Sequence, residues 1–430
     1  MRVTVAALGK IGLPLAVQIA SKGVEVVGAD VSESVVESVN RGEPHFPGED
    51  GLAERLASVV EDGLLHATSD TTSAVSESDV VVVVVPLMTD SDGVPDFSAM
   101  DAATEAIGRG MKAGTLVSYE TTLPVGTTRD RFGPMLAETS GLEVGEGFFL
   151  IHSPERVFSG RIFSDLRRYP KLVGGVDEES TKRGVAFYEL VLDFDDRPDL
   201  DRRNGVWAMN SAEAAELAKL AETTYRDVNI ALANEFAEFA ETAGIDIAEV
   251  ISASNSQPFS HIHRPGVAVG GHCIPVYPRF YLAGHPGAAL VETARKVNRD
   301  VPARVVSSVE EALGGLSGRT VLVLGAAYRG GVKETAYSGV FELVAAIRSA
   351  GGRAVVTDPL YQAGELTSLG LEPWEGSEID AAIVQADHPE YRSLAPEDLP
   401  GVEVVYDGRW VVDEANWRAS NVRFLVIGRG

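Results

Sequence analysis

The feature that most constrains the fold is a glycine turn close to the N-terminus. The apolar run Val3 to Leu8 predicts a strand, and it leads through Gly9-Lys10-Ile11-Gly12 into a helical pattern over residues 13–21. A second predicted strand, residues 24–28, is followed by Asp30. A glycine turn between a strand and a helix, with an acid closing the next strand, is the arrangement that binds dinucleotides. The chain is therefore expected to open with a nucleotide-binding β-α-β unit.

The residues of this turn have separate physical roles. Gly9 lets the backbone approach a pyrophosphate, Gly12 permits close packing of the helix on the strand, and the helix N-terminus faces the anion. Asp30 can accept hydrogen bonds from ribose hydroxyls, and its charge would repel a 2′-phosphate, so NAD is favoured over NADP. The first glycine of the usual pattern is replaced by Ala7. Alanine fits there if its φ stays negative.

Runs of β-branched residues separated by helix-length segments indicate the fold class. Residues 80–85 and 116–118 continue the strands of the first third. A second such unit starts near Arg319. Its predicted strands are residues 320–324, 354–357, 382–384 and 402–406, with a helix at 340–350. This pattern predicts an α/β protein with two Rossmann-like, doubly wound parallel sheets.

The middle of the chain has a different pattern. From Asn210 to Thr242 there is no Gly or Pro, and Ala, Leu, Glu and Phe recur at helical spacing. Asn210 resembles an N-cap with Glu213 as its capping-box partner, and Gly244 ends the run. One long helix that supports a homodimer is therefore expected. The predicted domains are residues 1–205, a helical region 206–306, and 307–430.

Composition restricts the partners and the cell compartment. There are 63 Asp and Glu against 37 Lys and Arg, for a formal net charge of -26. Such a charge disfavours nucleic acid and is typical of a salt-rich cytoplasm or of an acidic proteome. The chain opens directly into a strand, and its valine run is too short to span a bilayer, so neither a signal peptide nor a membrane partner is expected. The single cysteine can form no intramolecular disulfide, which favours a reducing cytoplasm.

Three short motifs carry candidate chemistry. The cysteine lies in Gly270-Gly271-His272-Cys273-Ile274-Pro275, where a thiolate could attack an aldehyde and the adduct could be oxidised to a thioester. Ser153-Pro154-Glu155-Arg156 follows an apolar run, so Glu155 suits a general base and Arg156 an anion contact. Lys219, on one helix face with Thr223 and Arg226, could stabilise an oxyanion. The alternatives are a structural cysteine, a surface ion pair and a solvated lysine.

The ordered set of motifs resembles the UDP-glucose and UDP-N-acetylmannosamine dehydrogenase family over nearly the whole chain. The Ser-Pro-Glu-Arg and Tyr225-Arg226-Asp227-Val228-Asn229 strings are more similar to the N-acetylhexosamine branch. The stretches that carry the resemblance are Gly9-Lys10-Ile11-Gly12-Leu13-Pro14, Thr121-Thr122-Leu123-Pro124, Ser153-Pro154-Glu155-Arg156, Gly270-Gly271-His272-Cys273, Ala327-Tyr328-Arg329 and Asp407-Gly408-Arg409.

The resemblance implies a four-electron oxidation of a UDP-sugar with two NAD. The implied substrate is UDP-N-acetylmannosamine, with UDP-glucose and UDP-N-acetylglucosamine as alternatives. It implies that Cys273 is the nucleophile, that Glu155 serves hydrolysis, that Lys219 stabilises the reacting oxygen and that Thr122 positions a water. The implied NAD contacts are Gly9, Lys10, Ile11, Gly12, Asp30, Pro86 and Thr122. The implied substrate contacts are Glu155, Arg156, Lys219, Gly270, Gly271, Tyr328, Arg329 and Arg409.

Several positions depart from the family pattern. Tyr277 stands where an aspartate is usual, Thr223 where an asparagine is usual, and Phe259 and Ala336 where arginines are usual. The usual Pro-Thr-Pro after the strand at 80–85 reads Pro86-Leu87-Met88. These departures indicate a distinct branch or weakened catalysis, and they leave a non-catalytic nucleotide-sugar binder as an alternative.

Other classes of protein fit the sequence less well. No tyrosine has a lysine four residues later, which disfavours a short-chain dehydrogenase or epimerase. His261, His263, His272 and Cys273 lack the tight paired spacing of structural zinc sites, so no metal is expected. The glycines at 325–331 are not followed by Lys-Ser or Lys-Thr, which disfavours a P-loop NTPase.

Overall fold

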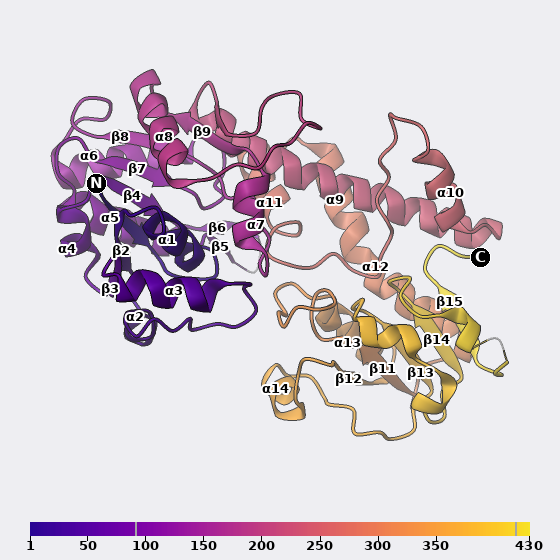
Figure 1. The fold of residues 1–430 in the computed structure, drawn as a ribbon. Coiled ribbons are helices and arrows are strands. Elements are labelled where there is room, and N and C mark those ends of the chain that lie inside the picture. The colour runs from indigo at the N-terminus through magenta and orange to yellow at the C-terminus, as the bar shows by residue number, and fades with distance from the viewer. Residues whose placement is uncertain (91–92, 418) are drawn as a thin grey trace. The chain divides into compact units, whose positions relative to one another are not determined.

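The predicted glycine turn joins strand β1 (Arg2–Ala6) to helix α1 (Gly12–Ala20), and β2 (Glu25–Ala29) follows (Figure 1). The computed structural model describes residues 1–90, 93–417 and 419–430. These residues form two compact units, 1–221 and 222–430. The division falls inside the long helix α9 (Ala212–Ala243).

The first unit contains an eight-stranded sheet in the order β10-β9-β8-β7-β4-β1-β2-β3. The six strands from β3 to β8 are parallel. Strands β2 and β3 are added on one side of β1, and the chain then crosses to the other side of β1 to add β4, β7 and β8. This is the strand order of dinucleotide-binding folds. The last two strands on the β8 side of the sheet run in the opposite direction: β9 is antiparallel to β8, and β10 pairs in parallel with β9. The remaining strands are β3 (Leu65–Thr68), β4 (Val80–Val83), β7 (Leu116–Tyr119), β8 (Phe149–His152), β9 (Lys171–Gly175) and β10 (Val206–Ala208), with a hairpin of β5 (Met88–Thr89) and β6 (Pro95–Asp96).

Helices cover both faces of this sheet, as the doubly wound class predicts. Apolar residues of α1, α3, α7 and α8 pack with Val3 and Val5 in one core. On the other face Tyr119 stacks on Phe132, with ring centroids 4.4 Å apart. The helices are α2 (Glu33–Asn40), α3 (Leu52–Glu61), α4 (Thr71–Ser76), α5 (Ser98–Gly110), the π-helix η1 (Thr128–Phe132), α6 (Gly133–Ser140), α7 (Ile162–Arg168) and α8 (Glu178–Val191).

The second unit contains a five-stranded parallel sheet in the order β12-β11-β13-β14-β15. One face packs against α12 and α13, and the other against irregular segments and short 3-10 turns that include Tyr391 and Trp417. Its strands are β11 (Thr320–Leu324), β12 (Arg353–Thr357), β13 (Ala381–Val384), β14 (Val404–Asp407) and β15 (Arg423–Val426). Its helices are α10 (Ile247–Ser254), α11 (Tyr277–Gly284), α12 (Ala289–Leu313), α13 (Val340–Ser349) and α14 (Ala363–Ser368), with 3-10 turns η2 (Pro389–Ser393), η3 (Pro396–Asp398) and η4 (Glu414–Asn416).

The long helix is present, but its predicted cap is wrong. Helix α9 begins at Ala212, and the hydroxyl of Ser211, not the side chain of Asn210, accepts a hydrogen bond from the Ala214 amide at 3.2 Å. The amide of Ala215 donates to the Ser211 carbonyl, which places Ser211 at the cap. Gly244 follows the helix with φ +69°, as a left-handed terminating residue.

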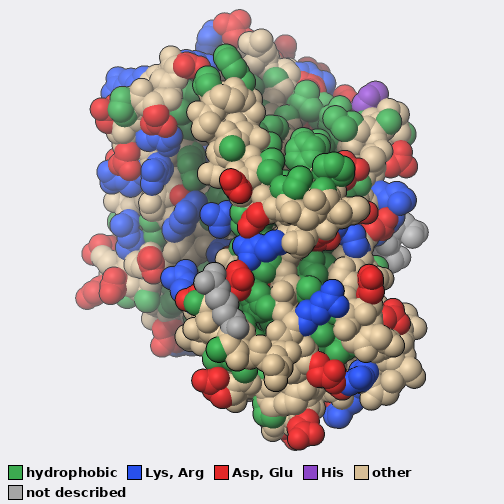
Figure 2. Space-filling model, turned by 90° about the vertical axis from the view of Figure 1, so that its right-hand side faces the viewer, with side chains coloured by type: hydrophobic (Ala, Val, Ile, Leu, Met, Phe, Trp, Pro, Cys, Tyr) green, Lys and Arg blue, Asp and Glu red, His purple; other side chains and the backbone are tan. Residues whose placement is uncertain are grey.

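The surface mixes charges of both signs. On the face drawn in Figure 2, acidic and basic side chains are scattered among hydrophobic ones. Across residues 1–90, 93–417 and 419–430, no helix is both long and apolar enough to cross a membrane.

Candidate active site

The turn after β1 has the geometry of a nucleotide site, with one correction. Ala7 has φ +72°, so the expectation of a negative φ is wrong, and alanine holds the left-handed conformation that glycine adopts more easily. A Cβ on Gly12 would lie 1.9 Å from the Ala7 carbonyl oxygen, so only glycine fits between helix and strand. A Cβ on Gly9 would meet nothing within 4 Å, which leaves this side of the turn open to a ligand.

Asp30 shapes the same turn. Its Oδ2 accepts from the Leu8 amide at 2.8 Å, and its Oδ1 accepts from the Ser32 amide at 2.9 Å. A carboxylate oxygen has two lone-pair positions, so each oxygen retains one for a ribose hydroxyl. Asp30 therefore both holds the turn and can contact the adenosine ribose.

The loops after β4 and β7 lie at the same carboxyl edge of the sheet. The hydroxyl of Thr121 donates to the Val85 carbonyl at 2.7 Å and joins the two loops. Pro86 is exposed, and Thr122 is buried. Because dinucleotides bind at this edge where the strand order reverses, the residues of the first unit fit NAD.

Glu155 lies in the loop after β8 and has a partner that the sequence did not reveal. Lys171, the first residue of β9, is only 4% exposed, and its Nζ donates to Glu155 Oε2 at 3.0 Å and to Glu120 Oε2 at 2.6 Å. Arg156 donates its amide to Glu155 Oε1 at 2.7 Å, and its guanidinium donates to the Pro170 carbonyl. A lysine that opens an apolar strand was the available signal for this cluster.

Lys219 lies on the first part of α9 and is 6% exposed, so it is not a solvated surface lysine. One turn before it, the buried carboxylate of Glu216 accepts from the amides of Gly126 and Thr128, at 2.6 and 2.9 Å, and from the Thr128 hydroxyl at 2.7 Å. Glu216 therefore fixes this part of the helix against the loop after β7.

Cys273 is exposed, in a loop whose glycines are required by close packing. A Cβ on Gly270 would lie 2.7 Å from Tyr328 Cβ, and a Cβ on Gly271 would lie 3.0 Å from Tyr328 Cε2. Gly271 also has φ +88°. The structure therefore brings Gly270, Gly271 and Tyr328 together, and the alternative of a buried structural cysteine is wrong.

Polar side chains of α9 hold the loop that precedes Cys273. Asn229 Oδ1 accepts from the His263 amide at 2.8 Å, and its Nδ2 donates to the His261 carbonyl at 2.8 Å. Asn234 Oδ1 accepts from the Gly266 amide at 3.0 Å.

A second contact of α9 fixes the residues after the cysteine. Asp227 forms a buried ion pair with Arg295, which also donates to the Pro275 carbonyl at 3.3 Å. Asn298 donates to Asp227 Oδ1 at 2.8 Å. The Tyr-Arg-Asp-Val-Asn string thus acts locally as a scaffold for the cysteine loop, a role that its sequence spacing did not reveal.

The second sheet presents Tyr328 and Arg329 in the loop after β11. Asp358, which follows β12 as Asp30 follows β2, accepts from the amides of Ala326 and Ala327 at 2.8 and 2.9 Å. Asp387 accepts from the Gly330 amide at 2.7 Å. These carboxylates fix the loop from both sides, and Arg329 lies beside Tyr328 with Nε 3.2 Å from the hydroxyl.

Arg409 is partly buried at the end of β14. Its Nε donates to the Gln385 carbonyl at 2.5 Å, and its amide donates to Asp407 Oδ1 at 2.9 Å. Gly266 leaves room for it, because a Cβ there would lie 2.7 Å from the Arg409 guanidinium. Arg409 therefore contacts the same chain segment that leads to Cys273.

The residues that depart from the family pattern have different positions. Tyr277 begins α11 and donates its amide to the Cys273 carbonyl at 2.9 Å. Thr223 is buried on α9, and the Ala336 carbonyl accepts from the Gly271 amide. Phe259 is 92% exposed.

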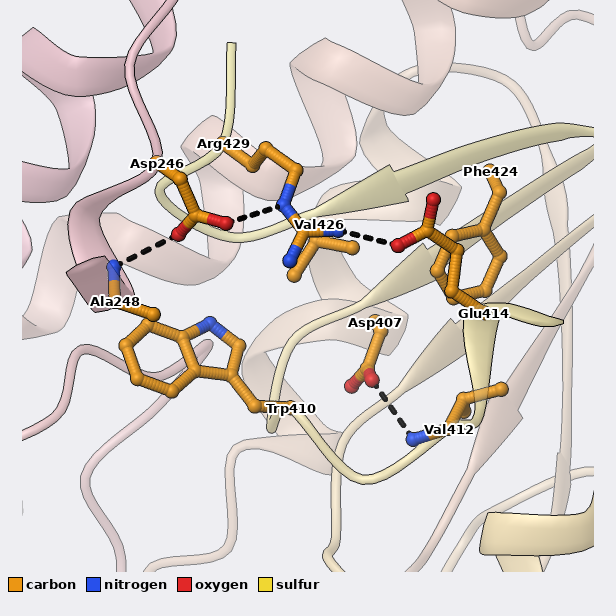
Figure 3. A pocket seen from close by; sticks show the side chains of 9 residues that line it. All are labelled: Asp246, Ala248, Asp407, Trp410, Val412, Glu414, Phe424, Val426 and Arg429. Carbon is orange, nitrogen blue, oxygen red and sulfur yellow. Dashed lines mark hydrogen bonds and ion pairs between the residues drawn. The ribbon is translucent and has the colours of Figure 1, made fainter.

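Two surface hollows are present among the described residues. Figure 3 shows one of about 180 Å³, where Arg429 bridges Asp246 and Glu414 beside Trp410. It is smaller than the roughly 300–1,000 Å³ that small-molecule sites span. The other, about 600 Å³, lies along β9, β10 and α8. Neither is lined by a candidate catalytic or NAD-binding residue.

Among the described residues, no group of three or more His, Cys, Asp or Glu side chains is arranged to hold a metal ion.

Together, a dinucleotide-binding sheet, a second nucleotide-type sheet and an exposed cysteine between glycine and proline residues define a nucleotide-dependent dehydrogenase. Residues 1–192, 213–300 and 322–414 match the NAD binding, central and UDP binding domains of the UDP-glucose/GDP-mannose dehydrogenase family. The chain belongs to this family and is an oxidoreductase, an NAD-dependent nucleotide-sugar dehydrogenase.

Individual relatives extend the likeness over the full length. UDP-N-acetyl-D-mannosamine dehydrogenase of Pyrococcus horikoshii is 35% identical over 438 residues, with 100% of both chains covered. A solved structure of UDP-D-ManNAc dehydrogenase from Pyrococcus horikoshii has a TM-score of 0.88 at 32% identity, again with 100% of both chains covered. A UDP-glucose dehydrogenase from Pyrobaculum islandicum has a TM-score of 0.86 at 27% identity, covering 100% of this chain and 98% of that one.

Proposed function

We propose that this protein oxidises the C6 hydroxyl of UDP-N-acetylmannosamine to a carboxylate through a thioester on Cys273. The observation that carries the proposal is the exposed Cys273 in a loop that Asn229, Asn234 and the Asp227–Arg295 pair hold. The names of the similar proteins from Pyrococcus horikoshii support the sugar. UDP-glucose and UDP-N-acetylglucosamine are the alternative substrates.

The reaction divides into two oxidations and a hydrolysis. Loss of a hydride and a proton from the alcohol gives an aldehyde. The Cys273 thiolate adds to the aldehyde carbon, and the oxygen takes up the proton that the thiol released, which gives a thiohemiacetal. A second loss of hydride and proton gives the thioester. NAD, when held by the residues of the first unit, would supply the hydride acceptor for each oxidation. Water then attacks the carbonyl carbon, the C–S bond breaks, and the electron pair leaves with the sulfur.

The remaining candidate residues take roles that suit their chemistry. Glu155 accepts the proton of the attacking water, Lys219 stabilises the negative oxygen, and Thr122 positions the water. The proposed sugar and diphosphate contacts are Arg156, Gly270, Gly271, Tyr328, Arg329 and Arg409, since guanidinium groups pair well with phosphates. The proposed NAD contacts are Gly9, Lys10, Ile11, Gly12, Asp30, Pro86 and Thr122.

These roles are distributed over three parts of the chain. We propose that residues 1–205 bind NAD, that 206–306 carry Lys219 and Cys273 and support dimerisation, and that 307–430 bind the UDP-sugar. The match to three separate domains of the family supports this division.

Substrate preference is tested by comparing kcat/KM for UDP-N-acetylmannosamine, UDP-N-acetylglucosamine and UDP-glucose. The proposal expects the highest value for the mannosamine sugar. A higher kcat/KM for UDP-glucose would show that UDP-glucose is the substrate, and the proposed reaction would be unchanged.

We also propose a homodimer formed through α9. Tyr225, Leu232, Phe236 and Phe239 are all exposed and follow one another at helical spacing, and Phe239 is 69% exposed. Light scattering on Phe239→Glu should show a smaller mass than that of the parent. The matched control is Leu190→Glu, an exposed residue of α8 outside this stripe, which should leave the mass unchanged. A monomeric parent protein would contradict the proposal.

A further inference from the structure

The buried side chains of Glu120 and Lys171 and the partly buried side chain of Glu155, at the ends of β7, β9 and β8, form a charge cluster. The Lys171 ammonium lies between two carboxylates, 2.6 Å from Glu120 Oε2 and 3.0 Å from Glu155 Oε2. Glu120 is 1% exposed, so one end of the cluster is shielded from solvent. A buried lysine is stable only when it is paired, and here one cation serves two anions.

The Glu120 end of the cluster is closed by protein groups. The Tyr188 hydroxyl donates to Glu120 Oε1 at 2.5 Å, and it lies 2.7 Å from the Ser118 hydroxyl. The Lys171 ammonium lies 4.8 Å from the centroid of the Tyr188 ring. Burial raises the pKa of Glu120 to about 7.

The Glu155 end is oriented by its own loop. Its Oε1 accepts from the Arg156 amide at 2.7 Å, and its backbone amide donates to the Glu120 carbonyl at 3.1 Å. Burial acts to raise the pKa of Glu155, but the Lys171 charge and the Arg156 amide outweigh it and hold that pKa below its usual value. The two carboxylates of one cluster thus differ in their readiness to lose a proton, which is a pattern of acid and base assignment in enzymes.

Two further titratable groups packed on the cluster are neutral near pH 7, and the Arg156 guanidinium is a second cation that lies beside it, on the Pro170 carbonyl. His152, the last residue of β8, is fully buried, and burial, assisted by Lys171, lowers its pKa to about 3. Burial raises the pKa of Tyr188 on α8 well above its usual value. Lys171 is therefore the cation that contacts both carboxyl groups of the cluster directly.

We propose that Lys171 is a positioning residue that keeps Glu155 ionised and aimed for the hydrolytic step, with Glu120 anchoring the ammonium from the far side. This inference rests on the proposed function of Glu155. In that step a C–O bond forms between water and the thioester carbon, and the released proton passes to the Glu155 carboxylate. The C–S bond breaks, and its electron pair leaves with the Cys273 sulfur.

The direct test follows the ionisation of Glu155 without any sugar. Protein carrying glutamate labelled with ¹³C at the side-chain carboxyl is titrated by NMR, and the Glu155 signal is the one missing from Glu155→Gln. In Lys171→Met the titration midpoint should rise by about one to three pH units, the shift that a nearby opposite charge produces. Lys171→Arg, which keeps the charge, should restore a low midpoint. An unchanged midpoint in Lys171→Met would overturn the inference.

Controls separate charge from misfolding and from the function itself. Tyr188→Phe removes one hydrogen bond to Glu120 and should move the Glu155 midpoint little. If Lys171→Met does not fold, the double variant Lys171→Met with Glu120→Gln removes one charge of each sign. Its Glu155 midpoint should still rise, and a midpoint equal to that of the parent would refute the role of Lys171.

A second readout uses the reaction. The pH profile of thioester hydrolysis in a single turnover should shift upward in Lys171→Met, while the preceding NADH burst stays at the parent amplitude. If the parent forms no NADH, the proposed function fails, and the NMR titration still reports on Lys171. If the parent is active and the pH profile does not move in the variant, only the role of Lys171 fails.

Discussion

Ala7 holds a backbone conformation that alanine seldom adopts. Its φ of +72° is imposed by its neighbours, because its amide donates to the Ala29 carbonyl at 2.8 Å and the next amide donates to Asp30. For a residue other than glycine, this conformation costs about 1–2 kcal/mol. The turn therefore keeps its geometry at the expense of stability.

Replacing Ala7 with glycine should stabilise the protein. We expect the free energy of unfolding to rise by about 0.5–1 kcal/mol, since relief of the strain exceeds the added entropy of the unfolded chain. Urea denaturation measures the change. Ala6→Gly, in the adjacent strand β1, should destabilise the protein and serves as the matched control. A destabilised Ala7→Gly protein would contradict this account of the turn.

Gly9 and Gly12 allow stability and ligand binding to be separated. A Cβ at Gly12 overlaps the Ala7 carbonyl, so Gly12→Ala should lower the free energy of unfolding by about 1–3 kcal/mol. A Cβ at Gly9 meets no protein atom, so Gly9→Ala should keep its stability while the Kd for NAD rises by roughly tenfold or more. Calorimetric titration and urea denaturation report the two effects. Equal NAD affinity in Gly9→Ala and the parent would argue against the proposed site.

At the scale of single elements, helix α9 contributes polar side chains to both compact units. Its first turns carry Glu216 and Lys219, and its later turns carry Asp227, Asn229 and Asn234, which hold the cysteine loop. The sequence predicted the helix from its spacing and its lack of Gly and Pro. It could not predict these contacts, because their partners lie 32 to 90 residues away in the chain.

Glu216 should make stability depend on pH. Burial raises its pKa to about 7 in the folded chain, against a reference value of 4.5. Between these values the folded state keeps a proton that the unfolded state loses, so this contribution is complete below pH 4.5 and is lost by about pH 7.

The comparison with Glu216→Gln isolates this effect from the other carboxylates. The stability of the parent minus that of the variant should fall as pH rises through this window, by at most about 1.4 kcal/mol per pH unit. Thermal and urea unfolding at several pH values provide the difference. A difference that does not change with pH would show that folding does not raise the pKa of Glu216.

Asn229 should control local opening of the loop before Cys273. In Asn229→Ala the His263 amide loses its acceptor, so hydrogen exchange at residues 261–263 should accelerate roughly tenfold. Glu235→Ala, an exposed change on the same helix, should leave that exchange unchanged. Identical exchange in Asn229→Ala and the parent would exclude Asn229 as a support of the loop.

At the scale of the whole molecule, the sequence predicts the two sheets better than their edges. Strands rich in valine, such as β4 and β11, follow directly from their composition. Strand β9 was missed because it opens with Lys171 and closes with two glycines, and β3 was missed because it is short and contains His66. The antiparallel edge depends on long-range pairing that local patterns do not record.

The candidate site shows the same limit. Motif residues such as Gly12, Asp30 and Gly270 were predicted from local patterns, and the close approaches around them give the physical reason for their identity. Lys171 and Glu120 were not predicted, because strand β9, which Lys171 opens, was itself missed and Glu120 belongs to none of the motifs that the sequence singled out. Only the pairing of β7, β8 and β9 brings them to Glu155.

The most direct test of the central claim is the number of NADH molecules formed per sugar consumed. With UDP-N-acetylmannosamine and excess NAD, the account predicts two NADH per sugar, and it predicts that Cys273→Ser loses this stoichiometry. One NADH per sugar would show that the reaction stops at the aldehyde and would contradict the thioester intermediate. If no UDP-sugar yields NADH while calorimetry still detects sugar binding, the protein is a nucleotide-sugar binding protein and not an enzyme.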